Sequence, residues 1–250
     1  MTSSIAANPE AARERLIFAL DVPDRETAAG YIRALSGRVG LFKLGLELFI
    51  REGRVIIDDI REQGGAGVFL DLKLHDIPAT VFRAMSNIAV LGVDFTTVHC
   101  AGQADMLKAA VEAAAGRVRL LGVTVLTSVS AGDVRSAGFA EPFASDVGRL
   151  VLKRAGEAAH HGLAGVVCSA AEAPLIKQKC GAGFLAVTPG IRSEADRMVA
   201  DDQQRVITPA RAVRNGADYL VVGRPIRDAA DPAAAAASIC REMVAAGSDS

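Results

Sequence analysis

Residues 68–78 read VFLDLKLHDIP, an apolar strand that ends in charged side chains and runs into a proline. Proline suits the first turn of a helix, because its missing N–H needs no partner there. Residues two apart in a strand point to the same face, so Asp71 and Lys73 are predicted to project together. Burying such charges is costly unless they are paired. The segment therefore predicts a strand followed by a helix, with an ion pair where the two meet.

Short β-branched runs of this kind alternate with helical patterns about eight times along the chain. Apolar residues recur at helical spacing between the runs, as in Val81, Met85 and Ile88. Eight such units favour a closed barrel over an open doubly wound sheet, which usually has about five or six strands. The predicted fold class is thus α/β, a single (β/α)8 TIM barrel. The predicted strands are 16–21, 39–44, 68–73, 94–99, 119–126, 165–168, 184–188 and 219–222.

The chain length favours one domain, because 250 residues is close to the roughly 250 of a typical barrel of this kind. No linker rich in Pro, Gly or Ser divides it. We expect residues 1–12 to be a flexible N-terminal tail and residues 13–250 to form one barrel domain. The connections 130–146 and 189–206 are longer than barrel closure requires, and such loops often hold or cover a substrate.

Composition excludes several classes of protein. The net charge of −1 leaves no chain-wide positive field for nucleic acid or anionic lipid, so any anion must be bound locally. The four cysteines have no metal-ligand or disulfide spacing, which predicts reduced thiols. Residues 1–10 lack the apolar core of a secretory signal, and no apolar run approaches the ~20 residues of a membrane span. We expect a cytoplasmic protein that contacts neither membrane nor nucleic acid.

Further charged residues lie where other strands are predicted to end. Asp21 closes the first strand and Lys43 is near the end of the second. Parallel strands of a barrel present their carboxyl ends at the face where active sites occur. Asp21, Lys43, Asp71 and Lys73 should therefore converge there, with Asp76 in the adjoining loop. A charge pair that merely closes the barrel mouth is the plainer alternative for Asp71 and Lys73 alone.

A second group of candidates follows strands seven and eight, in the segments TPGIR at 188–192 and GRPI at 223–226. These two loops often form the phosphate site of such barrels. Glycine lets backbone N–H groups approach a phosphate, and arginine offers a bidentate fork. Either Gly-Arg step alone could be an ordinary surface turn. Both together favour a phosphate site beside the charged cluster.

These motifs together resemble the orotidine 5′-phosphate decarboxylase family, in its bacterial branch. The resemblance is strongest in D-x-K-x-x-D-I-P at residues 71–78, followed by Thr80. The flanking matches occur in the family's order over residues 16–227: ALD at 19–21, FKLG at 42–45, LTS at 126–128, TPGIR at 188–192, DQ at 202–203 and GRPI at 223–226.

The resemblance implies conversion of orotidine 5′-phosphate to uridine 5′-phosphate in pyrimidine biosynthesis, without cofactor or metal, by a homodimer. It also implies roles for single residues. Lys73 would protonate C6, Asp71 would lie against the substrate carboxylate, and Asp76 would enter the neighbouring subunit's site. The remaining candidates would bind substrate: Asp21 and Lys43 the ribose, Thr80 the ribose across the interface, Thr127 and Ser128 the pyrimidine, and Arg192, Gln203, Gly223 and Arg224 the phosphate, with Pro189 lining the site.

The chemistry of the residues agrees with this resemblance. Carbanion chemistry commonly needs an electron sink, and a fixed ammonium can supply preorganised electrostatic stabilisation instead. Two alternatives remain open. A Mg²⁺-dependent 3-keto-6-phosphogulonate decarboxylase or hexulose-phosphate synthase would carry a similar D-x-K-x-x-D, although Ile77-Pro78 and the long 190–203 segment disfavour it. A non-catalytic phosphate-binding barrel would not need the Asp–Lys–Asp cluster.

Overall fold

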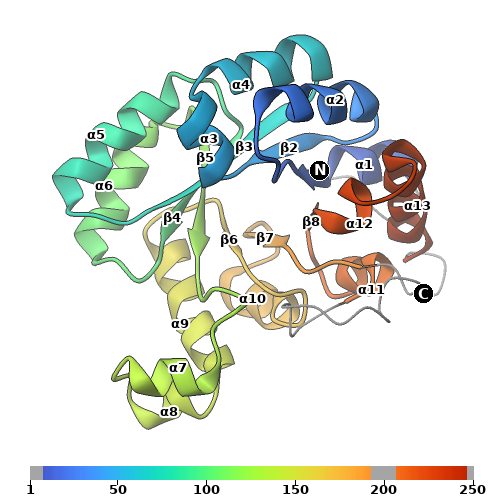
Figure 1. The fold of residues 1–250 in the computed structure, drawn as a ribbon. Helices are drawn as coiled ribbons and strands as arrows, with labels where there is room; N and C mark the ends of the chain where they lie inside the picture. The colour runs from blue at the N-terminus through green and yellow to red at the C-terminus, as the bar shows by residue number, and fades with distance from the viewer. Residues whose placement is uncertain (1–7, 193–206, 247–250) are drawn as a thin grey trace.

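The computed structural model describes residues 8–192 and 207–246. The strands that these residues form make a closed barrel in which each pairs in parallel with the next and β8 pairs with β1 (Figure 1). The predicted single (β/α)8 barrel is therefore confirmed. The strands are β1 Leu16–Ala19, β2 Leu41–Leu44, β3 Gly67–Leu74, β4 Phe95–His99, β5 Arg119–Val123, β6 Gly165–Val167, β7 Leu185–Thr188 and β8 Tyr219–Val222.

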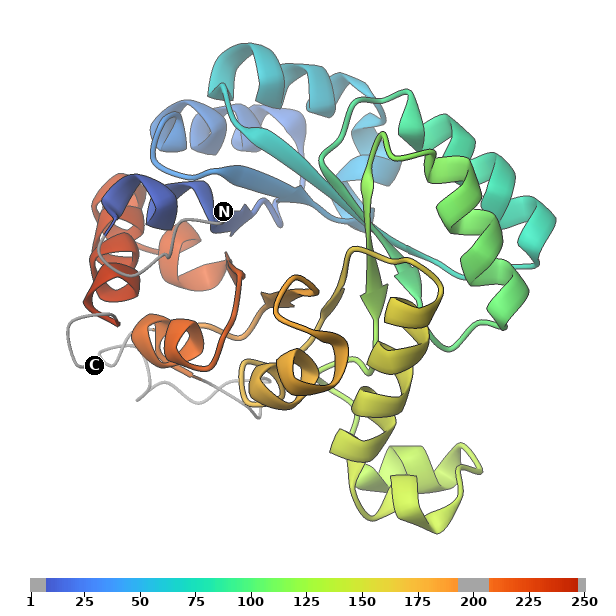
Figure 2. The same ribbon diagram turned by 180° about the vertical axis from the view of Figure 1, so that it is seen from behind.

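Helices surround the barrel on all sides, as both ribbon views show (Figures 1 and 2). Aspartates begin several of them; for example, the Asp24 and Asp231 side chains accept hydrogen bonds from backbone N–H groups of the first turn. None of the helices in residues 8–192 and 207–246 is long and apolar enough to cross a membrane. They are α1 Pro9–Glu14, α2 Arg25–Leu35, α3 Leu46–Glu52, α4 Val55–Asp59, the π-helix η1 Ile60–Gly64, α5 Pro78–Ala89, α6 Ala104–Ala114, α7 Ala131–Ser136, α8 Glu141–Ala144, α9 Val147–His160, α10 Ala173–Cys180, α11 Pro209–Arg214, α12 Arg224–Arg227 and α13 Pro232–Ala245.

The core has two layers, because the strands bury side chains on both faces. One layer lies between the strands and the helices. The other fills the barrel, where the Phe69 and Phe95 rings meet edge to face at 6.0 Å. The Arg119 guanidinium lies 3.9 Å from the centre of the Phe95 ring. With the interior packed by apolar groups, the charged candidates are confined to the carboxyl-end mouth.

Part of the segment predicted as a flexible N-terminal tail is helical. Residues 9–12, expected in the flexible tail, belong to α1, which Asn8 caps by accepting from the Glu10 and Ala11 N–H groups. Ala11 and Ala12 are buried, and α1 contacts α13. The prediction was wrong for these residues because two small alanines give a weak amphipathic signal, yet they fit closely against a neighbouring helix. Residues 1–7 lie outside the described residues.

The two long connections differ from plain loops. Segment 130–146 folds into α7 and α8, which extend beyond α9 and away from the barrel (Figures 1 and 2). The two short helices share a small core with the start of α9, built on Val134, Ala144, Val147 and Leu150. Of segment 189–206, residues 193–206 are outside the described part. Its flanks are joined, since the Arg192 N–H donates to the Ile207 carbonyl at 3.2 Å.

A mostly buried ion pair joins the end of α10 to the start of β8. The Lys177 ammonium donates to Asp218 Oδ2 at 2.6 Å and to the Phe184 carbonyl at 2.8 Å. The same Asp218 oxygen accepts from the Ala186 N–H at 2.7 Å. Only 17% and 20% of the two side chains is exposed, so this pair is largely desolvated. Loss of either residue would leave the charge of the other largely buried and without its ion-pair partner.

We expect Asp218→Ala to lower the free energy of unfolding by about 2–3 kcal/mol. This loss is smaller than that for breaking a fully buried ion pair, because some solvent reaches the pair of Lys177 with Asp218. Urea denaturation followed by circular dichroism measures this loss. Asp58→Ala is the matched control. The ion pair of Asp58 with Arg54, four residues earlier, is exposed to solvent and should contribute under about 0.5 kcal/mol. Equal losses in the two variants would contradict the prediction.

Candidate active site

Four side chains form a row of alternating charge across the mouth of the barrel. The Lys43 ammonium lies 2.9 Å from Asp21 Oδ1 and 4.0 Å from Asp71 Oδ2. The Lys73 ammonium lies 2.8 Å from the same Asp71 oxygen. Asp71 therefore accepts from Lys73 and also faces Lys43. The structure brings together the four residues that the strand ends predicted, from β1, β2 and β3.

The inner members of the row are the most buried. The side chains of Lys43 and Asp71 are 13% and 12% exposed, whereas that of Lys73 is 32% exposed. A charge in such a position is tolerated because opposite charges flank it. Lys73 is tied to Asp71 and yet accessible, so it is the lysine best placed to meet a ligand that enters the mouth.

An irregularity in β3 places Lys73. Its φ of 52° is in the left-handed region, which residues other than glycine seldom adopt. The pairing of β3 with β4 shifts register between Leu70 and Leu74. The Lys73 N–H donates to the Thr97 hydroxyl oxygen at 2.8 Å instead. Regular strand alternation thus predicted the contact between Asp71 and Lys73. It did not predict the left-handed backbone conformation of Lys73 that accompanies this contact.

Thr97 was missed by the sequence analysis. It lies in β4, is fully buried, and its hydroxyl donates to Asp71 Oδ1 at 2.8 Å. A signal was present in the sequence, because Phe95, Thr97 and His99 alternate on one face of the strand. That face points into the barrel, where Phe95 is packed.

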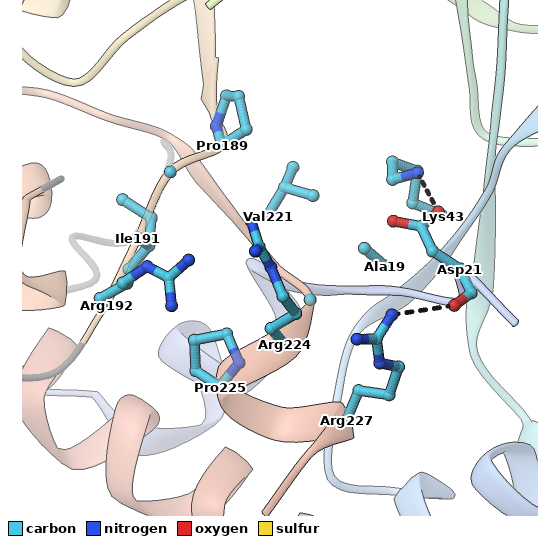
Figure 3. A pocket seen from close by; sticks show the side chains of 12 residues that line it. Ala19, Asp21, Lys43, Pro189, Ile191, Arg192, Val221, Arg224, Pro225 and Arg227 are labelled. Carbon is cyan, nitrogen blue, oxygen red and sulfur yellow. Dashed lines mark hydrogen bonds and ion pairs between the residues drawn. The ribbon is translucent and has the colours of Figure 1, made fainter. Parts of the chain in front are cut away.

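A cavity of about 260 Å³ opens beside the outer end of the row. Figure 3 shows Arg192 on one side, Arg224 and Arg227 along the base, and Asp21 with Lys43 opposite. Gly190 has a φ of 78°, which suits glycine where the loop after β7 turns. Three guanidinium groups around one cavity create the local positive field that the net charge of the chain does not supply. An anionic group such as a phosphate fits this end.

A second cavity of about 180 Å³ lies toward Lys73 and Asp71. It adjoins the first, because Lys43, Pro189 and Val221 line both. Its remaining walls are largely apolar: Phe69, Val123, Val125, Leu126, Thr127, Val167 and Cys168. The two cavities together can hold a ligand with an anionic group at one end and a flat ring near the Lys73 ammonium at the other.

Not all the predicted residues lie in these cavities. Asp76, Thr80 and Ser128 line neither of them. Asp76 is exposed and its Oδ1 accepts from the Ile77 N–H at 2.6 Å. Gln203 lies outside the described residues. Within this single chain, the described part of the site therefore lacks the Asp76 carboxylate.

Arg227 is a second residue that the sequence analysis did not select. Its guanidinium donates to the Asp21 carbonyl at 3.2 Å and makes two hydrogen bonds to Asp228 (Figure 3 shows the first). The hydrogen bond to Asp228 raises the pKa of Arg227, which keeps it charged. Its spacing of three residues from Arg224 on α12 was the available signal.

His99 has a neighbour that the sequence did not suggest. Its ring centre lies 5.4 Å from that of His75 at the end of β3. Burial, with the nearby His75 and Lys73 charges, lowers the pKa of His99, so its imidazole is neutral at neutral pH. In the described residues no three His, Cys, Asp or Glu side chains are grouped as ligands for one metal ion.

Fold and site define the class of protein: a (β/α)8-barrel enzyme with a lysine–aspartate row beside an arginine-lined cavity. Residues 14–239 match the profile of the Orotidine 5'-phosphate decarboxylase / HUMPS family. The chain belongs to that family.

Individual relatives agree over almost the whole chain. An orotidine 5'-phosphate decarboxylase of Desulfosudis oleivorans is 57% identical over 244 residues, which cover 97% of this chain and 98% of the relative. One of Syntrophus aciditrophicus is 47% identical, over 92% of this chain and 93% of the relative. The crystal structure of orotidine 5'-phosphate decarboxylase from Lactobacillus acidophilus has a TM-score of 0.79 at 36% identity, covering 91% of this chain and 98% of that one.

The two buried cysteines, Cys100 and Cys168, should be unreactive. Burial raises the pKa of Cys168, which lines the second cavity, and raises that of Cys100 to about 12. Because thiolate is the reactive form, very little of Cys100 is reactive at pH 8. Iodoacetamide at pH 8 should therefore modify neither within an hour and leave activity intact, as peptide mass spectrometry and an assay can show.

Guanidinium-unfolded protein is the control and should be alkylated at all four cysteines. Cys180, which is only partly buried, should react first in the native protein. Rapid native alkylation of Cys168 would contradict this account of the cavity.

Proposed function

We propose that this chain converts orotidine 5′-phosphate to uridine 5′-phosphate and carbon dioxide in pyrimidine biosynthesis. The family and the names of its relatives support this reaction. The observation that carries the proposal is the position of the Lys73 ammonium. It is held 2.8 Å from Asp71 at the inner end of a pocket whose outer end is lined by arginines.

The charge row suits the chemistry of this step. When the bond between C6 and the carboxylate breaks, its electron pair stays on C6 and carbon dioxide leaves. The Lys73 ammonium stabilises that charge and then gives its proton to C6, forming the C–H bond of the product. A fixed cation in a site with little water needs no reorganisation at that moment, which is why it accelerates the step. We propose that no cofactor takes part, since the ammonium does this itself.

Asp71 has two functions in the proposal. Its carboxylate is hydrogen-bonded to the Lys73 ammonium and also faces the Lys43 ammonium, so it fixes the position of Lys73. It also lies where the substrate carboxylate must approach, so repulsion between the two is relieved when carbon dioxide departs.

The substrate would lie across both cavities. Arg192 and Arg224 grip the phosphate, with Gly223 beside it and Pro189 between the two cavities. Asp21 and Lys43 bind the ribose hydroxyls, and Thr127 faces the pyrimidine in the second cavity. We also assign Gln203 to the phosphate and Ser128 to the pyrimidine, from the family resemblance alone. Phosphate contacts remote from C6 can raise the rate of the chemical step through closure around the substrate.

We further propose that the enzyme is a homodimer whose partner supplies Asp76 and Thr80. Asp76 lies outside both cavities of its own chain, beside apolar residues that face solvent. Ile77, the next residue, is large, apolar and exposed; Phe82 in α5 and Leu126 at the mouth are exposed as well. An exposed apolar patch beside an incomplete site is typical of an interface between subunits. We place the enzyme in the cytoplasm, in keeping with four cysteines that are unbridged.

Lys73→Ala should lower kcat for orotidine 5′-phosphate by more than about 10⁴-fold, because both charge stabilisation and the proton donor are lost. Uridine 5′-phosphate should still bind, since its phosphate contacts are intact. The loss of substrate absorbance gives kcat, and calorimetry gives the product affinity. Wild-type activity should persist in EDTA; its disappearance would instead favour the Mg²⁺-dependent members of the wider family.

Arg224→Ala is the contrasting variant. It removes a phosphate contact, so we expect KM to rise at least about tenfold with a smaller loss of kcat.

Near-normal turnover by Lys73→Ala would refute the assignment of Lys73 as proton donor.

A shared site predicts complementation between two inactive proteins. In a dimer of one Lys73→Ala chain and one Asp76→Asn chain, one site has both defects and the other has none. After equal mixing, half the dimers are mixed, so about one quarter of wild-type activity should return. Each protein incubated alone is the control. If activity stays absent although mass spectrometry shows that subunits have exchanged, Asp76 acts within its own chain.

A further inference from the structure

One buried hydroxyl connects two parts of the charged row. Thr97 Oγ1 accepts from the Lys73 N–H at 2.8 Å and donates to Asp71 Oδ1 at 2.8 Å. A hydroxyl has a single hydrogen. That hydrogen is directed at Asp71 Oδ1, while one of the two lone pairs of the hydroxyl oxygen receives the Lys73 N–H. Each of these bonds spans β3 and β4, where the ladder between the strands is irregular.

The hydroxyl lies where β3 is least regular. Lys73 has a φ of 52°, a conformation that costs roughly 1–3 kcal/mol and persists only where the surroundings enforce it. Its N–H lies where the pairing of β3 with β4 shifts register, and it donates to the Thr97 hydroxyl oxygen. Without it, the Lys73 backbone would be free to relax toward an ordinary strand conformation, which would move the root of the ammonium-bearing side chain.

The same hydroxyl sets the Asp71 carboxylate. Asp71 Oδ1 bonds to Thr97, while Oδ2 accepts from Lys73 and faces Lys43. A carboxylate bonded through both oxygens cannot rotate without breaking one of these bonds. Thr97 thus decides which oxygen faces the lysines.

We propose that Thr97 is a positioning residue for the decarboxylation, acting through Asp71 and Lys73 and not by touching substrate. The inference rests on the function proposed above. It assigns the hydroxyl, not the bulk of the side chain, to aligning the proton donor with C6. Misplacement by about 1 Å of a group at a reacting centre can cost 10²-fold in rate.

Thr97→Val tests this, because it keeps the branched shape and removes only the hydroxyl. We expect kcat to fall about 10- to 100-fold, with KM for orotidine 5′-phosphate changed less than threefold, since the phosphate contacts remain. Thr97→Ser restores the hydroxyl and should return kcat to within threefold of wild type. Crystal structures of the variants should show the hydrogen bond between Asp71 and Lys73 broken in Thr97→Val and intact in Thr97→Ser.

Thr96→Val is the matched control. Thr96 is the preceding residue of β4 and is equally buried, but in the described structure its Oγ1 has no hydrogen-bond partner. We expect its kcat to equal that of wild type. Melting temperatures of all three variants identify any loss of folded protein.

Two kinetic results would overturn the proposal: full kcat in folded Thr97→Val, or Thr97→Ser no more active than Thr97→Val. If wild-type protein failed to decarboxylate orotidine 5′-phosphate, the proposed function would fall. The crystal structures would still decide the positioning, since an unchanged hydrogen bond between Asp71 and Lys73 in Thr97→Val would refute it.

Discussion

The rest of the site depends on the contacts that the Asp71 carboxylate makes. It receives a hydrogen bond from Lys73, faces Lys43 and is held by Thr97. Removing it would leave two ammonium groups near each other in a partly buried site, where like charges repel. The carboxylate therefore makes it possible to hold the Lys73 ammonium where the proposed reaction needs a cation. Stability and chemistry depend on the same group.

Barrel closure makes this arrangement possible. Parallel strands place all their carboxyl ends at one mouth, so residues from β1, β2 and β3 meet although about 50 positions separate Asp21 from Lys73. The apolar side chains that fill the barrel keep charge and water away from the floor of the mouth. Against that floor, ion pairs are stronger than on the surface. The loops after β7 and β8 add the arginine-lined end of the same pocket.

A division of labour follows from these positions. In the proposed function, the arginines around the outer cavity attract and orient an anion in a chain whose net charge is −1. In the proposed reaction, the lysine–aspartate row at the inner end acts on the carbon that changes. Binding free energy gained at one end can thus be used at the other. The exposed position of Asp76 is consistent with a second copy of the chain completing this inner end.

Local patterns in the chain were enough to determine the barrel, the eight strand positions and the charged residues at the strand ends. Those features depend on side-chain periodicity over a few residues, which a sequence displays directly. Tertiary structure alone decided the Thr97 bridge, the left-handed backbone at Lys73 and the packing of α1. Thr97 meets Asp71 across 26 residues, and such a contact follows from the register between β3 and β4. Register is set by the packing of the whole barrel, so no short segment encodes it.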